Sequence, residues 1–145
     1  AGSAAIRVLA DAGIPVTVMT APIIPGLNDH EIPRILEAAA KAGATGAGYV
    51  MVRLAYGLAP LFEDWLERNF PDRKEKVLHK IRDMRGGKMN DTRFGVRQRG
   101  EGVLARELTD LFRLSCRKYG LNKEDRELST ASFSRTAGAQ GELFI

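Results

Sequence analysis

The chain has 145 residues, a formal net charge of +4 and 44% hydrophobic residues, which is the composition of one ordinary globular domain. No run approaches the roughly 20 consecutive apolar residues of a membrane helix, and residues 1–12 lack the pattern of a signal peptide. The single cysteine, Cys116, excludes an internal disulfide and fits a reducing compartment. We therefore expect a cytoplasmic protein without a membrane partner.

The first predicted elements are a helix over residues 4–12, with Ile6, Leu9 and Ala10 on one face, and a strand that follows it. Gly13 stands where a helix-ending glycine belongs. The run I-P-V-T-V-M-T-A-P-I-I-P-G-L-N-D, which starts at Ile14, is β-branched and apolar and predicts a buried strand opening into a loop. Ligands of α/β folds bind at the carboxyl ends of strands, so this loop is the first candidate site.

A second unit repeats the same order. Asn28 and Asp29 offer helix-capping side chains, and an apolar stripe follows at helical spacing: Ile32, Ile35, Leu36 and Ala39. Gly43 ends this helix, and residues 44–54, with Y-V-M-V-R-L, predict another buried strand. The order of elements indicates two adjacent parallel strands joined by a right-handed crossover.

Two parallel strands leave faces and edges of a sheet uncovered. Because the chain also begins inside a helix, we interpret it as the carboxyl-terminal fragment of a βα barrel or a doubly wound sheet. Residues 1–57 would hold the βα units, residues 58–121 a helical extension, and residues 122–145 a mobile polar tail. The open edges predict self-association through the exposed strands, exchange of elements between copies, or marginal stability.

The predicted helical extension contains three amphipathic helices and one loop. Leu58, Leu61, Phe62, Trp65 and Leu66 form the stripe of the first helix, and residues 74–84 form the second. Residues 88–102 are a basic, glycine-rich loop. The last helix covers residues 103–119, with Cys116 as a small core residue and Gly120-Leu121 as its end.

Several segments resemble the radical S-adenosylmethionine (radical SAM) superfamily. The run P-I-I-P-G-L-N-D, between A-G-I-P and H-E-I, looks like its fifth strand, where a Gly-x-Ile-x-Gly-x-x-Glu pattern often occurs. Ile24 and Gly26 match that pattern, Asp29 stands for its acidic residue, and Pro22 replaces its first glycine. The segments G-G-K-M-N-D-T-R-F-G, G-E-G and L-F-R-L-S-C-R-K-Y-G-L resemble the carboxyl-terminal part of bacterial enzymes related to spore photoproduct lyase. The likeness runs from about residue 4 to residue 133.

The resemblance implies a partial barrel that binds S-adenosylmethionine and a [4Fe-4S] cluster, and it suggests DNA repair. Ile24, Gly26 and Asp29 would then lie against the adenosyl part of the cofactor. The family binds its cluster through a Cys-x3-Cys-x2-Cys motif, which this sequence lacks. We therefore expect neither cofactor on this chain alone, no catalytic or metal-binding residue in it, and no activity without the remainder of its barrel.

Further candidate residues are basic. Arg53 stands at the end of the second strand, where a charge is costly unless it is paired or faces a cavity. We therefore expect it either to line a pocket or to form a salt bridge to Asp29 or Glu63. An alternative function as a small nucleic-acid-binding module would use the basic stretch from residue 68 to residue 99. Within this stretch, the loop offers cations for phosphates and an aromatic ring for a base: Arg93, Arg97, Arg99 and Phe94. A solvated basic surface is the simpler explanation of that loop.

The tail carries one motif. Gln140, Leu143 and Phe144 belong to Q-G-E-L-F, which is similar to the Q-x-x-L-F peptide by which bacterial proteins dock on the DNA sliding clamp. A Leu-Phe pair on a mobile tail is able to fill an apolar pocket on a partner. The sequence thus predicts docking on a partner as one alternative function, and an ordinary disordered end as the other explanation.

Overall fold

The structure is a computed structural model that describes residues 2–90, 96–123 and 131. It contains two strands, β1 (Thr17–Ile23) and β2 (Gly46–Met51), which pair in parallel, with Thr17 opposite Gly46 and Ile23 opposite Met51. The strands are joined by the short 3-10 turn η1 (Asp29–Glu31) and helix α2 (Ile32–Lys41). The predicted α/β class with two adjacent parallel strands is confirmed.

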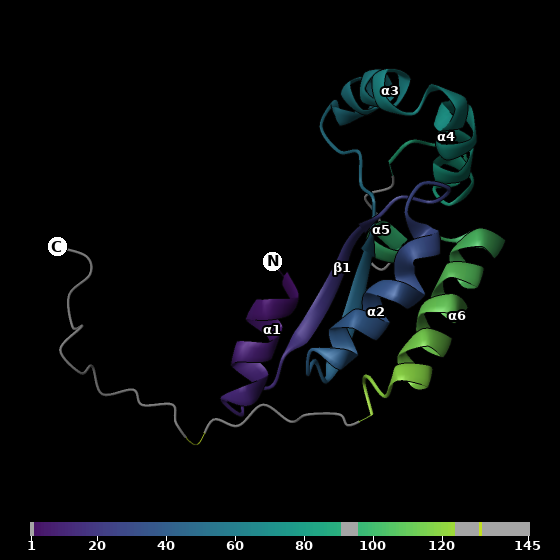
Figure 1. Cartoon of the computed structure of the whole chain (residues 1–145). Helices are drawn as coiled ribbons and strands as arrows, with labels where there is room; N and C mark the ends of the chain where they lie inside the picture. The colour runs from purple at the N-terminus through teal and green to yellow at the C-terminus, as the bar shows by residue number, and fades with distance from the viewer. Residues whose placement is uncertain (1, 91–95, 124–130, 132–145) are drawn as a thin grey trace, which may run out of the picture.

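The other helices precede and follow this unit (Figure 1). Their bounds are α1 (Gly2–Asp11), α3 (Leu58–Asn69), η2 (Pro71–Arg73), α4 (Lys74–Asp83), α5 (Val96–Arg99) and α6 (Gly102–Tyr119). No helix in these described ranges is long and apolar enough to cross a membrane.

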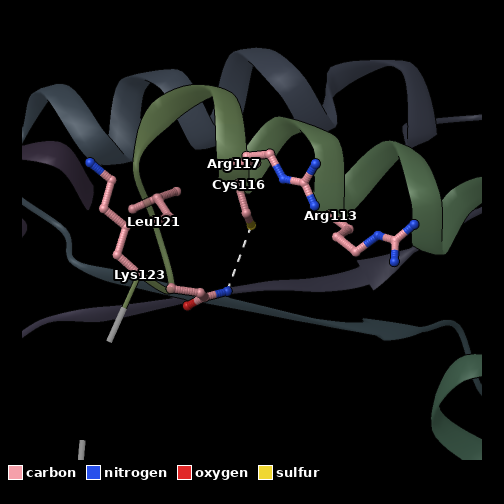
Figure 2. A pocket seen from close by; sticks show the side chains of 6 residues that line it. Arg113, Cys116, Arg117, Leu121 and Lys123 are labelled. Carbon is pink, nitrogen blue, oxygen red and sulfur yellow. Dashed lines mark hydrogen bonds between the residues drawn. The ribbon is translucent and has the colours of Figure 1, made fainter. Parts of the chain in front are cut away.

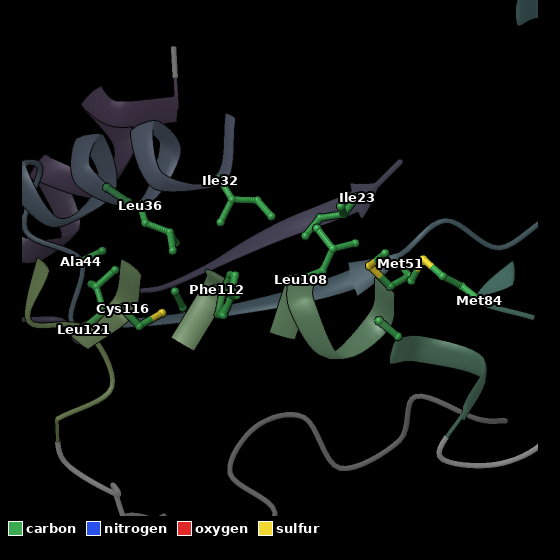
Figure 3. Packing of buried hydrophobic residues seen from close by; sticks show 13 residues of the cluster. Ile23, Ile32, Leu36, Ala44, Met51, Met84, Leu108, Phe112, Cys116 and Leu121 are labelled. Atoms are coloured by element: carbon green, nitrogen blue, oxygen red, sulfur yellow. The ribbon is translucent and has the colours of Figure 1, made fainter. Parts of the chain in front are cut away.

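One face of the sheet is covered by α2 and α6, and the main core lies between them (Figure 3). Ile23 and Met51 point from the strands toward side chains of these two helices, among them Leu36 and Phe112. The hydroxyl groups of Tyr49 and Thr109 lie 2.7 Å apart, which ties β2 to α6 by a polar contact as well. Helix α6 is therefore part of the sheet core, although the sequence analysis assigned it to the helical extension.

The opposite face of the sheet carries little cover. Met19 is 60% exposed there, and its sulfur lies 3.0 Å from the position that a Cβ on Gly48 would take. Thr17 is exposed next to Gly46 in the same way, with its hydroxyl 2.7 Å from the equivalent position. In the described residues the sheet is thus buried on one side only.

A second, smaller core lies beyond the carboxyl ends of the strands, where α3 and α4 pack together (Figure 1). Its buried members come from these helices and from the segment after β2: Val52, Leu54, Leu66, Val77, Leu78 and Ile81. Helix α3 buries only Leu66, whereas Leu58, Leu61 and Trp65 of its predicted stripe are exposed. Apolar spacing alone therefore overestimated how much of α3 is covered.

The predicted helix ends are confirmed. After α1 and α2 the chain turns at Gly13 and Gly43, with φ angles of +74° and +102°. The N–H of Ile14 donates to the C=O of Leu9, and the N–H of Ala44 donates to the C=O of Ala39, as in the Schellman motif. After α6, the N–H of Leu121 donates to the C=O of Cys116 in the same way.

Three local predictions were wrong. Strand β2 ends at Met51 rather than at Leu54, because the chain then leaves the sheet and Leu54 is buried in the second core. A short helix, α5, stands inside the segment predicted to be a loop. Asn28 and Asp29 do not cap α2 with their side chains, since these bond to the loop after β1 instead.

Gly43→Ala should destabilise the protein more than Gly13→Ala, although both glycines end helices with positive φ. A Cβ at position 43 would lie 2.6 Å from the Cβ of Ala10, whereas position 13 has open space. We expect Gly13→Ala to lower the free energy of unfolding by about 1–2 kcal/mol, and Gly43→Ala by roughly 2–4 kcal/mol because overpacking adds to the strain. Urea unfolding of the two variants tests this, and equal losses would contradict the close α1–α2 packing.

Candidate functional site

The candidate site is the carboxyl end of the sheet, where the loop after β1 is held by the side chain of Asn28. Its Oδ1 accepts the N–H of Ile24 at 2.7 Å, and its Nδ2 donates to the C=O of Pro22 at 3.1 Å. The amide thereby binds a donor and an acceptor of the strand end together. An asparagine suits this position because it offers both groups at once.

Asp29 holds the next turn of the same loop. Its Oδ2 accepts the N–H of Gly26 at 3.0 Å, and its Oδ1 accepts the N–H of His30 at 3.2 Å. Both carboxylate oxygens are thus engaged by backbone groups of the loop. The sequence analysis predicted a cofactor contact for Asp29; the geometry gives it a part in shaping the loop.

The loop also contacts α4. The Nζ of Lys80 lies 4.0 Å from Oδ2 of Asp29, and the two side chains are 27% and 17% exposed. The stem of Lys80 lies against Gly26, where a Cβ would come within 3.2 Å of the Lys80 Cδ. Gly26 therefore does allow a close approach, and in this structure the group that approaches is a lysine of the chain itself.

The end of β2 meets the same loop. The N–H of Val52 donates to the C=O of Ile23 at 2.8 Å, and the C=O of Val52 accepts Nη2 of Arg85 at 2.9 Å. Arg85 is only 2% exposed. Sequence reasoning missed it as a site residue, because its local pattern matches that of the exposed cations in the same basic stretch.

Arg53 follows Val52 and is exposed. Its predicted salt bridge to Asp29 or Glu63 is absent from the described residues, where Asp29 pairs with Lys80 instead. The structure therefore brings Ile24, Gly26 and Asp29 together in one loop. It leaves Arg53 exposed near the end of the neighbouring strand.

The other predicted binding residues are more scattered. Arg97 and Arg99 stand on α5, half-buried and exposed respectively. Arg93 and Phe94 lie outside the described residues, and so do Gln140, Leu143 and Phe144 of the tail motif. The proposed phosphate and base contacts of the basic loop stay predictions.

Two grooves lie elsewhere on the surface. One, of about 310 Å³, opens at the end of α6 (Figure 2) and is lined by Arg113, Cys116, Arg117, Leu121, Asn122 and Lys123. The other, of about 510 Å³, lies between α4 and α6 and is lined by His79, Lys80, Asp83, Glu101, Val103, Leu104 and Glu107. The second groove is lined by side chains of both charge signs. Among them, Nε2 of His79 lies 3.3 Å from the Asp83 carboxylate.

Cys116 forms part of the floor of the first groove. It packs in the main core, as predicted, and burial raises the pKa of its thiol. The Nδ2 of Asn122 lies 3.7 Å from its sulfur. A neutral, buried thiol is a poor nucleophile and a poor metal ligand.

The residues present do not fit an iron–sulfur cluster. A [4Fe-4S] cluster needs several cysteine thiolates, and Cys116 is the only cysteine of the chain. Among the described residues, no group of three or more histidine, cysteine, aspartate or glutamate side chains is placed to hold a metal ion.

No protein-family model, curated protein or solved structure matches the chain.

Asp29→Ala should loosen the loop after β1. The change removes the acceptors of two backbone N–H groups and the partner of Lys80, so we expect the free energy of unfolding to fall by about 1–2 kcal/mol. Glu31→Ala is the matched control, since that carboxylate is exposed and close in sequence. Equal stability of the two variants in urea would contradict the loop-holding role.

Cys116 should react slowly in the folded protein. Burial hides the sulfur, and the raised pKa lowers the thiolate fraction at any pH below it. At about pH 8 we expect alkylation by iodoacetamide to be roughly a hundredfold slower than in the guanidinium-unfolded chain. Comparable rates in the two states would show that the end of α6 opens readily.

Proposed function

We propose that this chain is the carboxyl-terminal βα part of a radical SAM enzyme of the spore photoproduct lyase-related branch. In that enzyme it would form one wall of the cofactor pocket and part of the substrate channel. The remainder of the barrel, with the cluster-binding cysteines, would be its partner. The proposal starts from the sequence resemblance of the loop after β1 and of the later segments.

The single structural observation that supports it is a parallel β1–α2–β2 unit that, among the described residues, is covered by helices on one face only. A barrel strand needs this arrangement, because its outer face packs on helices while its inner face lines the interior. Met19 and Gly48 would then face the interior. The preceding strands of the barrel would pair with β1.

Within this proposal the residues of the loop divide into two roles. Asn28 and Asp29 would keep the loop in shape through their backbone contacts, since their polar atoms are already engaged. Arg53 would be the residue that reaches the ligand, because its guanidinium is exposed beside the strand end. Ile24 and Gly26 would together provide the surface of the loop.

A nucleic-acid-binding function receives weaker support. Several cations of the basic stretch pair with carboxylates: Arg68 with Asp64, Lys74 with Glu67, and Lys80 with Asp29. Such pairs reduce the positive field that would attract phosphates. DNA binding and DNA repair therefore stay predictions from the sequence.

The deciding experiment uses the chain extended by the coding sequence that precedes it. The longer protein, treated anaerobically with iron and sulfide, should acquire the absorbance of an iron–sulfur cluster. With S-adenosylmethionine and a reductant it should then release 5′-deoxyadenosine. The 145-residue chain carried through the same treatment is the control, and a longer protein that binds no cluster would overturn the proposal.

Arg53→Ala tests the role of the exposed guanidinium in that longer protein. Loss of a charged hydrogen bond should weaken S-adenosylmethionine binding about tenfold or more. The free energy of unfolding should change by less than about 0.5 kcal/mol, because the side chain is exposed. Arg34→Ala, on the exposed side of α2, is the matched control. Unchanged affinity in Arg53→Ala would remove this residue from the site.

A further inference from the structure

The groove of about 310 Å³ at the end of α6 lies at the opposite end of the sheet from the candidate site. The N–H of Asn122 donates to the C=O of Thr45, and its Oδ1 and Nδ2 bond to the N–H and the C=O of Ala47, all at 2.9 Å. These bonds close the outer edge of β2 where the strand begins, and they fix one wall of the groove. The groove therefore belongs to α6 and the turn after it, and it shares no residue with the loop after β1.

The floor of the groove is apolar and held in place. Cys116 and Leu121 are 5% and 3% exposed, and both pack in the main core. The N–H of Leu121 donates to the C=O of Cys116 at 2.9 Å, which is the bond that ends α6. A preformed apolar surface of this kind suits the organic part of a ligand.

The rim of the groove is cationic, and none of the residues that line it is acidic. Arg113 and Arg117 stand one turn apart on α6, and Figure 2 shows their side chains extending in the same direction along the helix. Nη2 of Arg113 lies 3.0 Å from Oδ1 of Asp110, whereas in the part of the chain that the structure describes Arg117 and Lys123 pair with no carboxylate. Like charges at this spacing repel each other, and one carboxylate balances only one of them. The groove thus keeps a positive charge.

We propose that this groove binds a small organic phosphate. Arg113 and Arg117 would hold the phosphate, because guanidinium groups present paired donors whose geometry matches phosphate oxygens. The organic part would lie on the floor formed by Cys116 and Leu121. A cavity of this size is at the lower end of the range of about 300–1,000 Å³ for ligand sites, so it suits one small molecule rather than a polymer. The inference does not depend on the proposed enzyme.

Calorimetric titration of the 145-residue chain with phenyl phosphate tests the proposal. Phenyl phosphate should bind at least about tenfold more tightly than inorganic phosphate, because its ring buries apolar surface on the floor. Arg117→Ala should weaken phenyl phosphate binding about tenfold or more, since it removes charged hydrogen bonds. Arg106→Ala is the matched control: it removes the same charge from an exposed position of α6 outside the groove, and the affinity should not change.

Asp110→Asn should change the affinity in the opposite direction. The substitution removes the carboxylate that pairs with Arg113, so phenyl phosphate should bind about threefold more tightly. Cys116 reports where the ligand lies, because its sulfur is at the floor of the groove. Saturating phenyl phosphate should slow the alkylation of Cys116 by iodoacetamide, and this protection should be lost in Arg117→Ala.

Circular dichroism shows whether each variant is folded, and if Arg117→Ala is not, Asp110→Asn and the protection of Cys116 decide. Equal affinities of Arg117→Ala and Arg106→Ala, or a wild type that does not bind phenyl phosphate at millimolar concentrations, would overturn the inference. A short single-stranded oligonucleotide is the last ligand to be titrated. If it binds more tightly than phenyl phosphate and loses affinity in Arg117→Ala, the assignment to a small ligand is wrong.

Discussion

The packing of α2 and α6 against one face of two strands is the interaction on which this fold depends. Ile23 and Met51 of the sheet meet Leu36 and Phe112 of the helices in one continuous core. A pair of parallel strands has too few hydrogen bonds to persist in water, so its stability comes from this apolar contact. In the part of the chain that the structure describes, this burial lies on one face of the sheet, and Met19 on the other face is exposed.

The same one-sided burial determines where a site is able to form. The strands end together at the side where α3 and α4 pack, and the loop after β1 is shaped there by polar side chains rather than by apolar ones. Each of Asn28 and Asp29 makes two hydrogen bonds to backbone groups, which gives the loop a defined shape. Lys80 then fastens the loop to α4, so that the small second core and the sheet end are linked.

Much of the candidate site followed from the sequence, but the roles within it did not. The apolar run ending in Pro-Gly located the loop, because a buried strand must reach the surface where its apolar residues stop. The sequence could not show that Asp29 turns inward while Arg53 stays exposed. The structure places the carboxylate of Asp29 beside Lys80, which lies about a third of the chain away in sequence.

The sequence by itself determined the order of elements and the positions at which helices end. These features are local. The spacing of apolar residues distinguishes strands from helices, and a glycine such as Gly43 adopts the left-handed conformation that a helix end requires. Only the tertiary structure decided the burial of Arg85 against Val52 and the closure of β2 by Asn122. Both contacts join residues far apart in the chain. The sequence alone does not show whether an arginine or an asparagine lies in solvent or bonds to the backbone of a strand.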